Sequence, residues 1–274
     1  MREVAANHGY YYDGVQLGEF YQLKFALELA REMERLCEDA WLIQTANPVF
    51  NCCTLLHRES SIKSCGLCHG HLGHRDIARA IGIDAERVST QAAGFNHNIW
   101  LSQCCYEGKD VYPLIDRWIE EEAERYWRSH RQNDTHDIQM SRAAVHQYRM
   151  YGLFPVGDTV RRVGGVPSVG CTVNQGEWWL HSDPDMKRFW FGEPWGGPDS
   201  VAGRRHFESV LSKRLEEMRE LARDPNARLV DSLGSVPSGE QIVPLIDSLV
   251  NDGAGEHQVN VPNPKPWGDR GASR

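Results

Sequence analysis

The chain has 274 residues, enough for one large domain or two small ones, and its 41% apolar and 25% charged residues are ordinary for a soluble globular protein. Its 30 basic and 38 acidic residues give a formal charge of −8, which disfavours a general nucleic-acid binder. No apolar run reaches the roughly 20 residues of a membrane span, and the first residues lack the apolar core of an export signal. We therefore expect a cytoplasmic protein without nucleic-acid or membrane partners.

The first part of the chain alternates between helix and strand. The segment Trp41-Leu-Ile-Gln44 predicts a buried strand up to about Thr45, and Pro48 suits the first turn of a following helix. This alternation is typical of the end of a βαβ array. An amphipathic helix is expected before it, over residues 19–37, where four apolar side chains recur at helical spacing: Phe20, Leu23, Leu27 and Ala30.

The later elements are mostly helical by pattern. We expect helices over about 113–129, 137–151, 200–223 and 239–250, and a glycine-rich loop over 164–176. A complete dinucleotide-binding unit would open with a strand and a Gly-x-Gly-x-x-Gly turn, and the sequence contains no such turn. The expectation is that the chain begins inside an α/β domain, after the part that would hold a pyrophosphate.

The run Cys65-Gly-Leu-Cys68-His69-Gly-His71 places metal ligands beside glycine. Its Cys-x-x-Cys-His spacing matches c-type haem attachment, but that chemistry requires export. A zinc site would need a second ligand pair of similar spacing, which the adjacent Cys104-Cys105 does not provide. The position of the Cys65-x-x-Cys68 motif in the chain argues against a thioredoxin-like redox pair. We interpret Cys65 as a buried free thiol, whereas the three histidines after Cys68 favour a functional role for that thiol.

The run Gly94-Phe-Asn96-His97-Asn98-Ile-Trp100 supplies a second candidate ligand. Taken alone, His97 is better explained as a hydrogen-bonded core histidine. Paired with Cys68 it becomes half of a metal shell, because one thiolate and one imidazole leave positions for substrate oxygens and water. The pair therefore predicts a metal-assisted active site in an α/β enzyme.

Four further residues and one loop allow a structural or a functional explanation. Asn47 follows the predicted buried strand, where it either caps the next helix or holds sugar hydroxyls. Asp158 is either a turn residue or a catalytic carboxylate. Arg161 and Arg162 are either solvated or, facing a pocket, bind an anionic substrate. The loop 193–199 mixes turn formers with an aromatic residue. It is equally well explained as a plain loop or as a segment whose aromatic ring contacts a sugar.

Taken together, the motifs resemble glycoside hydrolase family 4 over nearly the whole chain and in the family's order. They are Ala40-Trp-Leu-Ile-Gln-Thr-Ala-Asn-Pro48, Gly66-Leu-Cys-His-Gly70, Gly94-Phe-Asn-His-Asn-Ile-Trp100, Tyr151-Gly-Leu-Phe-Pro-Val-Gly-Asp-Thr159, Phe191-Gly-Glu-Pro-Trp-Gly-Gly197 and Val259-Asn-Val-Pro-Asn263. The resemblance implies an α/β fold. We expect residues 1–60 to be the remnant of an NAD-binding Rossmann-type domain. Residues 61–274 would form a catalytic α+β domain similar to the C-terminal domain of lactate and malate dehydrogenases.

The resemblance also implies a reaction that differs from two-carboxylate glycoside hydrolysis. NAD takes a hydride from C3 of the sugar, a base removes the acidified C2 proton, and the aglycone leaves C1 by elimination. Water then adds and the hydride returns. A divalent cation such as Mn²⁺ stabilises charge on the C2 and C3 oxygens. The implied cofactors are NAD and Mn²⁺, and the implied assembly is a homo-oligomer.

The residues that match the family's motifs receive their roles from this resemblance. Cys68 and His97 would bind the metal, Asn47 would contact substrate and cofactor, His69 would assist the leaving group and Asp158 would be the base. Asn96 and Arg161 are the remaining candidates for substrate binding.

The substrate also follows from the family. Cys-His forms of the metal-cysteine motif go with unphosphorylated glycosides, and the Cys-His-Gly form resembles the subgroup that acts on uronides such as α-glucuronides or α-galacturonides. We expect an α-glucuronidase-like enzyme, with an α-glucosidase or α-galactosidase as the alternative. Because the glycine fingerprint is absent, we expect little turnover by the isolated chain. A third possibility is that the chain binds sugar without turning it over. A hydroxy-acid dehydrogenase, the remaining alternative, would need no thiolate ligand.

Overall fold

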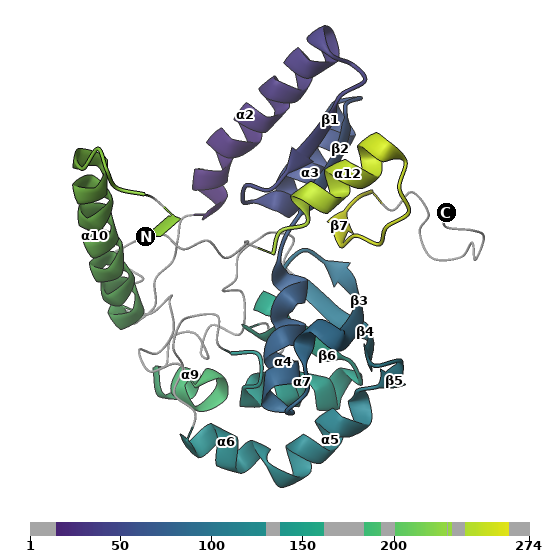
Figure 1. The fold of residues 1–274 in the computed structure, drawn as a ribbon, viewed down its shortest axis with the longest axis vertical. Coiled ribbons are helices and arrows are strands. Elements are labelled where there is room, and N and C mark those ends of the chain that lie inside the picture. The colour runs from purple at the N-terminus through teal and green to yellow at the C-terminus, as the bar shows by residue number, and fades with distance from the viewer. Residues whose placement is uncertain are drawn as a thin grey trace. The chain divides into compact units, whose positions relative to one another are not determined.

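The computed structural model describes residues 15–129, 138–161, 184–192, 201–228, 230–231 and 239–262. Their contacts divide them into two compact units, whose elements are labelled in Figure 1. The parallel-sheet unit contains Gln16–Cys68 and residues 241–262, and the antiparallel-sheet unit contains the described residues from 69 to 240. This division differs from the expected boundary near residue 60, because the strand that ends before Cys68 pairs within the first sheet.

The parallel-sheet unit contains the predicted βαβ arrangement. Its elements are α2 (Val15–Leu36), β1 (Trp41–Gln44), α3 (Val49–Glu59), β2 (Lys63–Leu67), α12 (Ile242–Asn251) and β7 (Val259–Asn260). β1 and β2 are parallel, with Gln44 opposite Gly66, and β7 pairs antiparallel to β2 with Asn260 opposite Gly66. The predicted helix, strand and helix in this region are therefore confirmed, whereas β7 was not predicted.

Small and branched side chains join α2 and α3 in this unit. Ala26 and Ala30 of α2 pack with Cys52 and Leu56 of α3 in one buried cluster. β2 lies against α3 so closely that a Cβ atom at Gly66 would meet the Cys53 Sγ atom and would lie 2.6 Å from the Val49 Cγ1 atom. A side chain at position 66 would therefore force the helix and the strand apart.

The antiparallel-sheet unit is built on a long hairpin. The hairpin consists of β3 and β4. In chain order, the first elements of this unit are η1 (Gly70–Gly73), α4 (His74–Ala80), η2 (Ala85–Arg87), β3 (Val88–Phe95), β4 (Asn98–Tyr106), β5 (Lys109–Asp110), α5 (Tyr112–Glu121) and α6 (Ala123–Ser129). The others are α7 (Arg142–Tyr151), β6 (Phe154–Val156), η3 (Gly157–Arg161), α9 (Pro184–Phe191) and α10 (Val201–Arg223). β4 pairs antiparallel with β3, β5 and β6.

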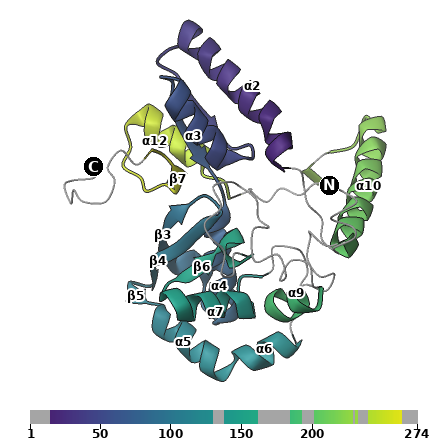
Figure 2. The ribbon, with the colours of Figure 1, turned by 180° about the vertical axis from the view of Figure 1, so that it is seen from behind.

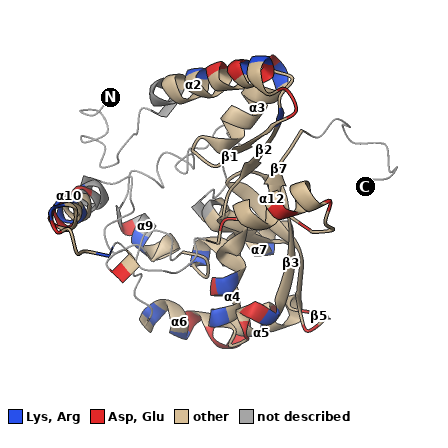
Figure 3. Ribbon diagram, turned by 45° about the horizontal axis from the view of Figure 1, so that its top comes forward, with Lys and Arg blue, Asp and Glu red and all other residues tan. Residues whose placement is uncertain are grey.

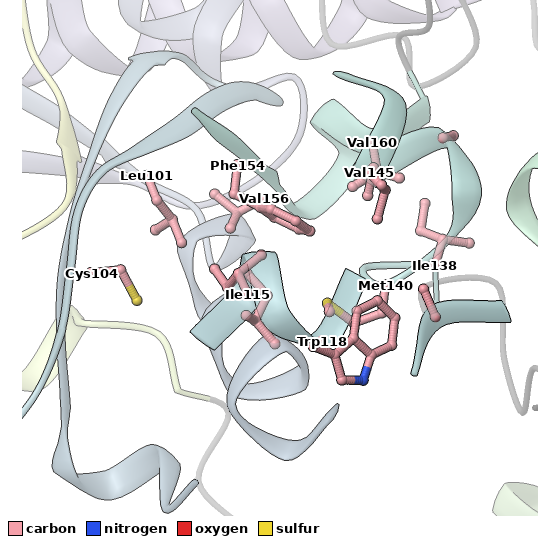
Figure 4. Close-up of a cluster of buried hydrophobic side chains, with 14 of the residues drawn as sticks. Leu101, Cys104, Ile115, Trp118, Ile138, Met140, Val145, Phe154, Val156 and Val160 are labelled. Carbon is pink, nitrogen blue, oxygen red and sulfur yellow. The ribbon is translucent and has the colours of Figure 1, made fainter. Parts of the chain in front are cut away.

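The core of this unit lies between the sheet and the helices α4, α5 and α7, which Figures 1 and 2 show beside β4 and β6. Leu101 from β4, Ile115 from α5 and Phe154 from β6 are each fully buried there. Figure 4 shows these side chains pointing toward one another. The buried apolar residues fix β4 and β6, the strands that lead to the candidate site.

Two predicted helices differ from the structure. The helix expected over 113–129 is two helices, α5 and α6, which break at Glu122. The break brings the Tyr126 and Trp127 rings to 5.3 and 6.5 Å from the Trp118 ring. The helix expected from 137 begins only at Arg142, because the Ser141 side chain caps it by accepting a hydrogen bond from the Ala144 N–H group.

Other predicted segments are either confirmed or not covered. α10 agrees with the helix expected over 200–223, and α12 agrees with most of the helix expected over 239–250. Charged side chains of both signs follow α2 and α10 (Figure 3). The glycine-rich loop over 164–176 and the loop 193–199 lie outside the described residues. Within the described part of the chain, no helix has both the length and the apolar character needed to cross a membrane.

We expect the Gly66→Ala variant to be destabilised by about 1–3 kcal/mol, because its added methyl group overlaps the Val49 and Cys53 side chains. Urea unfolding measures this difference. The matched control is Gly253→Ala, whose Cβ atom would lie at an ordinary 3.7 Å from the Ser248 Cα atom. Equal stability of the two variants would contradict the close packing of β2 on α3.

Candidate functional site

Polar residues follow both parallel strands of the parallel-sheet unit. Asn47 lies three residues after β1 and is exposed, and Cys68 comes directly after β2 and is half-buried. The carboxyl ends of neighbouring parallel strands share one edge of a sheet, which is where α/β proteins commonly bind ligands. The sequence therefore delivers an amide and a thiol to one edge. The strand before Asn47 was expected to be buried, but β1 is only partly buried, and Trp41 at its start is exposed.

The two cysteines of the Cys-x-x-Cys run differ in environment. Cys65 is only 3% exposed inside β2, and its burial raises the pKa of its thiol. Because the thiolate is the form that binds metals and attacks electrophiles, a thiol with a raised pKa is a poor ligand. Cys68 lies beyond the strand and is less buried. Of the two thiols, Cys68 is thus the better candidate ligand.

His97 lies in the antiparallel-sheet unit, in the two-residue turn between β3 and β4. Phe95 pairs with Asn98 across this turn, and His97 has the left-handed backbone conformation, with φ of 59°. Gly94 has φ of 139°, and a Cβ atom there would overlap the Asn98 carbonyl oxygen. The glycine that leads the motif therefore lets the strands approach, and the turn holds the imidazole at the end of the hairpin.

Thr159 fixes the Asp158 segment to this hairpin. Its side chain is fully buried, and its Oγ1 atom accepts a hydrogen bond of 2.7 Å from the Ile99 N–H group. The backbone of Asp158 in η3 is thereby held beside the start of β4. The side chains of Asp158 and Arg161 lie outside the described part of the structure, so their roles stay predictions.

Close backbone packing brings η1 and η3 together. A Cβ atom at Gly157, which has φ of 60°, would lie 2.8 Å from the Gly70 carbonyl oxygen and 2.9 Å from the Gly70 Cα atom. The buried Gln139 side chain adds two hydrogen bonds: its amide donates to the Pro155 carbonyl and its oxygen accepts from the Gly157 N–H group. The segment after Cys68 and the segment that carries Asp158 are therefore neighbours.

His69 has a partner from a distant part of the chain. The His69 Nδ1 atom lies 2.9 Å from the Glu240 Oε1 atom, across 171 positions of sequence. Sequence reasoning missed Glu240, because a single carboxylate just before a helix carries no local signal that separates it from solvated charge. His74, which crowds the same motif, is buried, and its Nδ1 atom lies 2.9 Å from the His71 carbonyl oxygen.

The structure thus distributes the predicted site residues over the two units. It brings His69, His97 and the Asp158 backbone into the antiparallel-sheet unit, whereas Asn47 and Cys68 belong to the parallel-sheet unit. Among the described residues, no group of three or more His, Cys, Asp or Glu side chains is close enough to hold a metal ion. The donor types of Cys68 and His97, a thiolate and an imidazole, suit a divalent cation that keeps open coordination positions.

These features define a mixed α/β protein with a parallel sheet whose edge carries a thiol and an amide, and an antiparallel unit that carries two histidines and a carboxylate. The model of the family 4 glycosyl hydrolase C-terminal domain matches residues 92–265, and the model described as family 4 glycosyl hydrolase matches residues 8–83. The chain belongs to glycosyl hydrolase family 4, as the sequence motifs predict.

The relatives have several activities in their names. An alpha-galacturonidase of Thermoanaerobacter italicus is 23% identical over 253 residues, which cover 86% of this chain and 50% of that protein. An alpha-galactosidase of Bacillus subtilis is 34% identical over 95 residues, 34% of this chain and 22% of that protein. The chain therefore spans half or less of the length of these relatives.

A solved structure shares the fold. It is a 6-phospho-alpha-glucosidase from gut microorganisms in complex with NAD and Mn²⁺, with a TM-score of 0.59 and 14% identity. The match covers 92% of this chain and 55% of that chain. The expected mixed α/β class is confirmed.

We expect Thr159→Val to lower the free energy of unfolding by about 1–3 kcal/mol, because the Ile99 N–H group loses its buried acceptor. The measurement is chemical denaturation of the whole chain. Thr159→Ser keeps the hydroxyl group and serves as the control. If the valine variant were as stable as the serine variant, Thr159 would not be what holds η3 to the hairpin.

Proposed function

We propose that this chain carries the metal- and substrate-binding part of an NAD- and metal-dependent α-glycosidase. The single observation that carries the proposal is the placement of Cys68 and Asn47 at the carboxyl edge of the parallel sheet in a chain of family 4. The NAD and Mn²⁺ bound to the 6-phospho-alpha-glucosidase of the same fold support the choice of cofactors. Cys68 and His97 would hold the cation, and Asn47 would contact substrate and cofactor.

When bound, NAD supplies a hydride acceptor at C3 of the sugar, and the cation withdraws electrons from the C2 and C3 oxygens. Asp158 takes the proton from C2, and the electron pair of that C–H bond forms the C1–C2 double bond. The C1–O bond breaks at the same stage, and its electron pair stays on the aglycone oxygen. His69, when its ring is protonated on both nitrogens, gives that oxygen the proton of its Nε2 atom, so the aglycone leaves as an alcohol. Water then adds across the C1–C2 double bond, and the hydride would return from the reduced cofactor to C3.

The substrate we propose is an α-uronide, in which C6 is a carboxylate. The Cys68-His69-Gly70 sequence supports this choice, and so does the alpha-galacturonidase named among the relatives. That name favours the galacturonide over the glucuronide expected from the motif alone. Arg161 would bind the carboxylate through paired charged hydrogen bonds. A neutral α-galactoside is the second candidate, because a relative of 34% identity over 95 residues is an alpha-galactosidase.

We expect Cys68→Ser to weaken Mn²⁺ binding by the chain at least about 10-fold, because a hydroxyl group does not replace a thiolate ligand. Titration calorimetry with Mn²⁺ measures it, with and without galacturonic acid. The matched control is Cys37→Ser, which changes an exposed cysteine just after α2 and should bind like the unchanged chain. Equal affinities in both variants would contradict the role of Cys68.

Release of 4-nitrophenol tests the reaction itself on the α-galacturonide, α-glucuronide and α-galactoside. Any turnover by the chain, however slow, should require both NAD and Mn²⁺ and should be fastest on a uronide. Each of the two is omitted in turn, as is the reductant that keeps the thiols reduced. Cleavage that continues without NAD and in the presence of a chelator would contradict the proposed chemistry. Preference for the galactoside would select the second candidate.

We expect Arg161→Gln to weaken uronide binding by roughly 10- to 100-fold, the size of one or two lost charged hydrogen bonds, and to leave a neutral galactoside unaffected. Competition with galacturonic acid and with galactose measures both affinities. Arg149→Gln, at an exposed arginine of α7, is the control for charge alone. An equal loss for both sugars would show that Arg161 does not recognise the carboxylate.

A further inference from the structure

We propose that Glu240 is a positioning residue that fixes the ring of His69 and its tautomer. The observation is the contact of 2.9 Å between the Glu240 Oε1 atom and the His69 Nδ1 atom. The carboxylate holds the proton on Nδ1, and the Nε2 atom is then the one available to substrate. The proposal rests on the proposed function only for the use made of Nε2.

The chemistry of the two groups sets the direction of the hydrogen bond. An ionised carboxylate has no proton to give, so Nδ1 must be the donor. Glu240 is the more withdrawn partner, with a side chain 20% exposed against 63% for His69. A carboxylate that is largely shielded from water makes a firmer contact than one of two exposed groups. The mobile, exposed imidazole is therefore held from its Nδ1 side.

The backbone conformation of the residue before Glu240 allows this contact. Gly239 has φ of 76°, and a Cβ atom there would lie 2.5 Å from the Leu72 Cδ1 atom of η1. Any other residue would be strained at this φ, and its Cβ atom would have to displace the Leu72 side chain of η1, which begins directly after His69. Glycine lets this stretch of chain lie on η1, so that the following carboxylate reaches His69.

The contact also lies where the chain passes between the two units. The chain enters the antiparallel-sheet unit between Cys68 and His69 and leaves it between Glu240 and Gln241. The Glu240–His69 hydrogen bond ties these two connections together. It acts on the residue next to the proposed metal ligand, where the orientation of one ring decides which nitrogen meets the leaving group.

The test is ¹⁵N NMR of the histidine side chains in the whole chain and in Glu240→Ala. The signals of His69 are those that disappear in His69→Gln. We expect Nδ1 to carry the proton in the unchanged chain and the proton to shift toward Nε2 in Glu240→Ala. Glu240→Gln keeps an acceptor oxygen and should restore the Nδ1–H tautomer. His74, whose Nδ1 atom faces the His71 carbonyl, is the internal reference and should not change.

The control variant is Glu86→Ala, which removes an exposed carboxylate that pairs with Arg75 in the same unit. It should leave the His69 signals unchanged. An Nε2–H tautomer of His69 in the unchanged chain, or the same tautomer in Glu240→Ala, would overturn the proposal. A general loss of structure in Glu240→Ala would also move the His74 signals. In that case Glu240→Gln decides, and a His69 proton on Nε2 in Glu240→Gln would overturn positioning by Glu240.

Turnover separates this inference from the function on which it depends. We expect Glu240→Ala to slow cleavage of a methyl α-uronide about 10-fold or more and the 4-nitrophenyl α-uronide much less. A ring that is no longer held through Nδ1 does not keep Nε2 toward the leaving group, and only the poor leaving group needs a proton from it. Equal losses would contradict positioning for leaving-group assistance. If the unchanged chain cleaves neither and binds no Mn²⁺, the proposed function of this chain fails, and the NMR result still decides whether Glu240 sets the tautomer.

Discussion

The contact between the backbones of Gly70 and Gly157 is the constraint on which this arrangement depends. A Cβ atom at position 157 would lie within 3 Å of two Gly70 atoms, so the two segments can touch because residue 157 is glycine. One segment continues from Cys68 and His69, and the other carries Asp158 and Thr159. The backbone that follows His69 and the backbone that carries Asp158, which are distant in sequence, are thereby brought together within the antiparallel-sheet unit.

Hydrogen bonds of two side chains turn this contact into a fixed geometry. The Gln139 side chain bonds to the Pro155 carbonyl of β6 and to the Gly157 N–H group of η3. The Thr159 side chain accepts a hydrogen bond from the Ile99 N–H group of β4. Both side chains are buried, so breaking any of these bonds leaves a backbone group without water to replace it. The β3–β4 turn that carries His97 and the η3 segment that carries Asp158 are consequently linked through β4, and fixed positions are what binding around a substrate requires.

Local patterns in the sequence predicted the parts of the fold that local physics determines. The apolar run after Trp41 predicted β1, helical spacing predicted α2, Pro48 predicted the start of α3, and a long charged segment predicted α10. The break between α5 and α6 was missed because its cause is tertiary: Trp118 packs against the rings of Tyr126 and Trp127. The extent of β3 and β4 was missed because their mixed small and polar residues give no strong two-residue alternation.

The candidate site shows the same limit in sharper form. Cys68, His97 and Asn47 could be proposed from the sequence because each stands in a motif beside glycine or proline, where backbone geometry leaves a trace in the sequence. Glu240 left none, since its role depends on a contact with His69 across 171 positions, and the glycine before it explains itself only once η1 is known to lie against it. A motif thus identifies the group that meets the ligand, whereas the group that orients it is visible only in three dimensions. In this chain the orienting carboxylate and the proposed metal thiol occupy the two connections between the units, so that chain topology and chemistry coincide at His69.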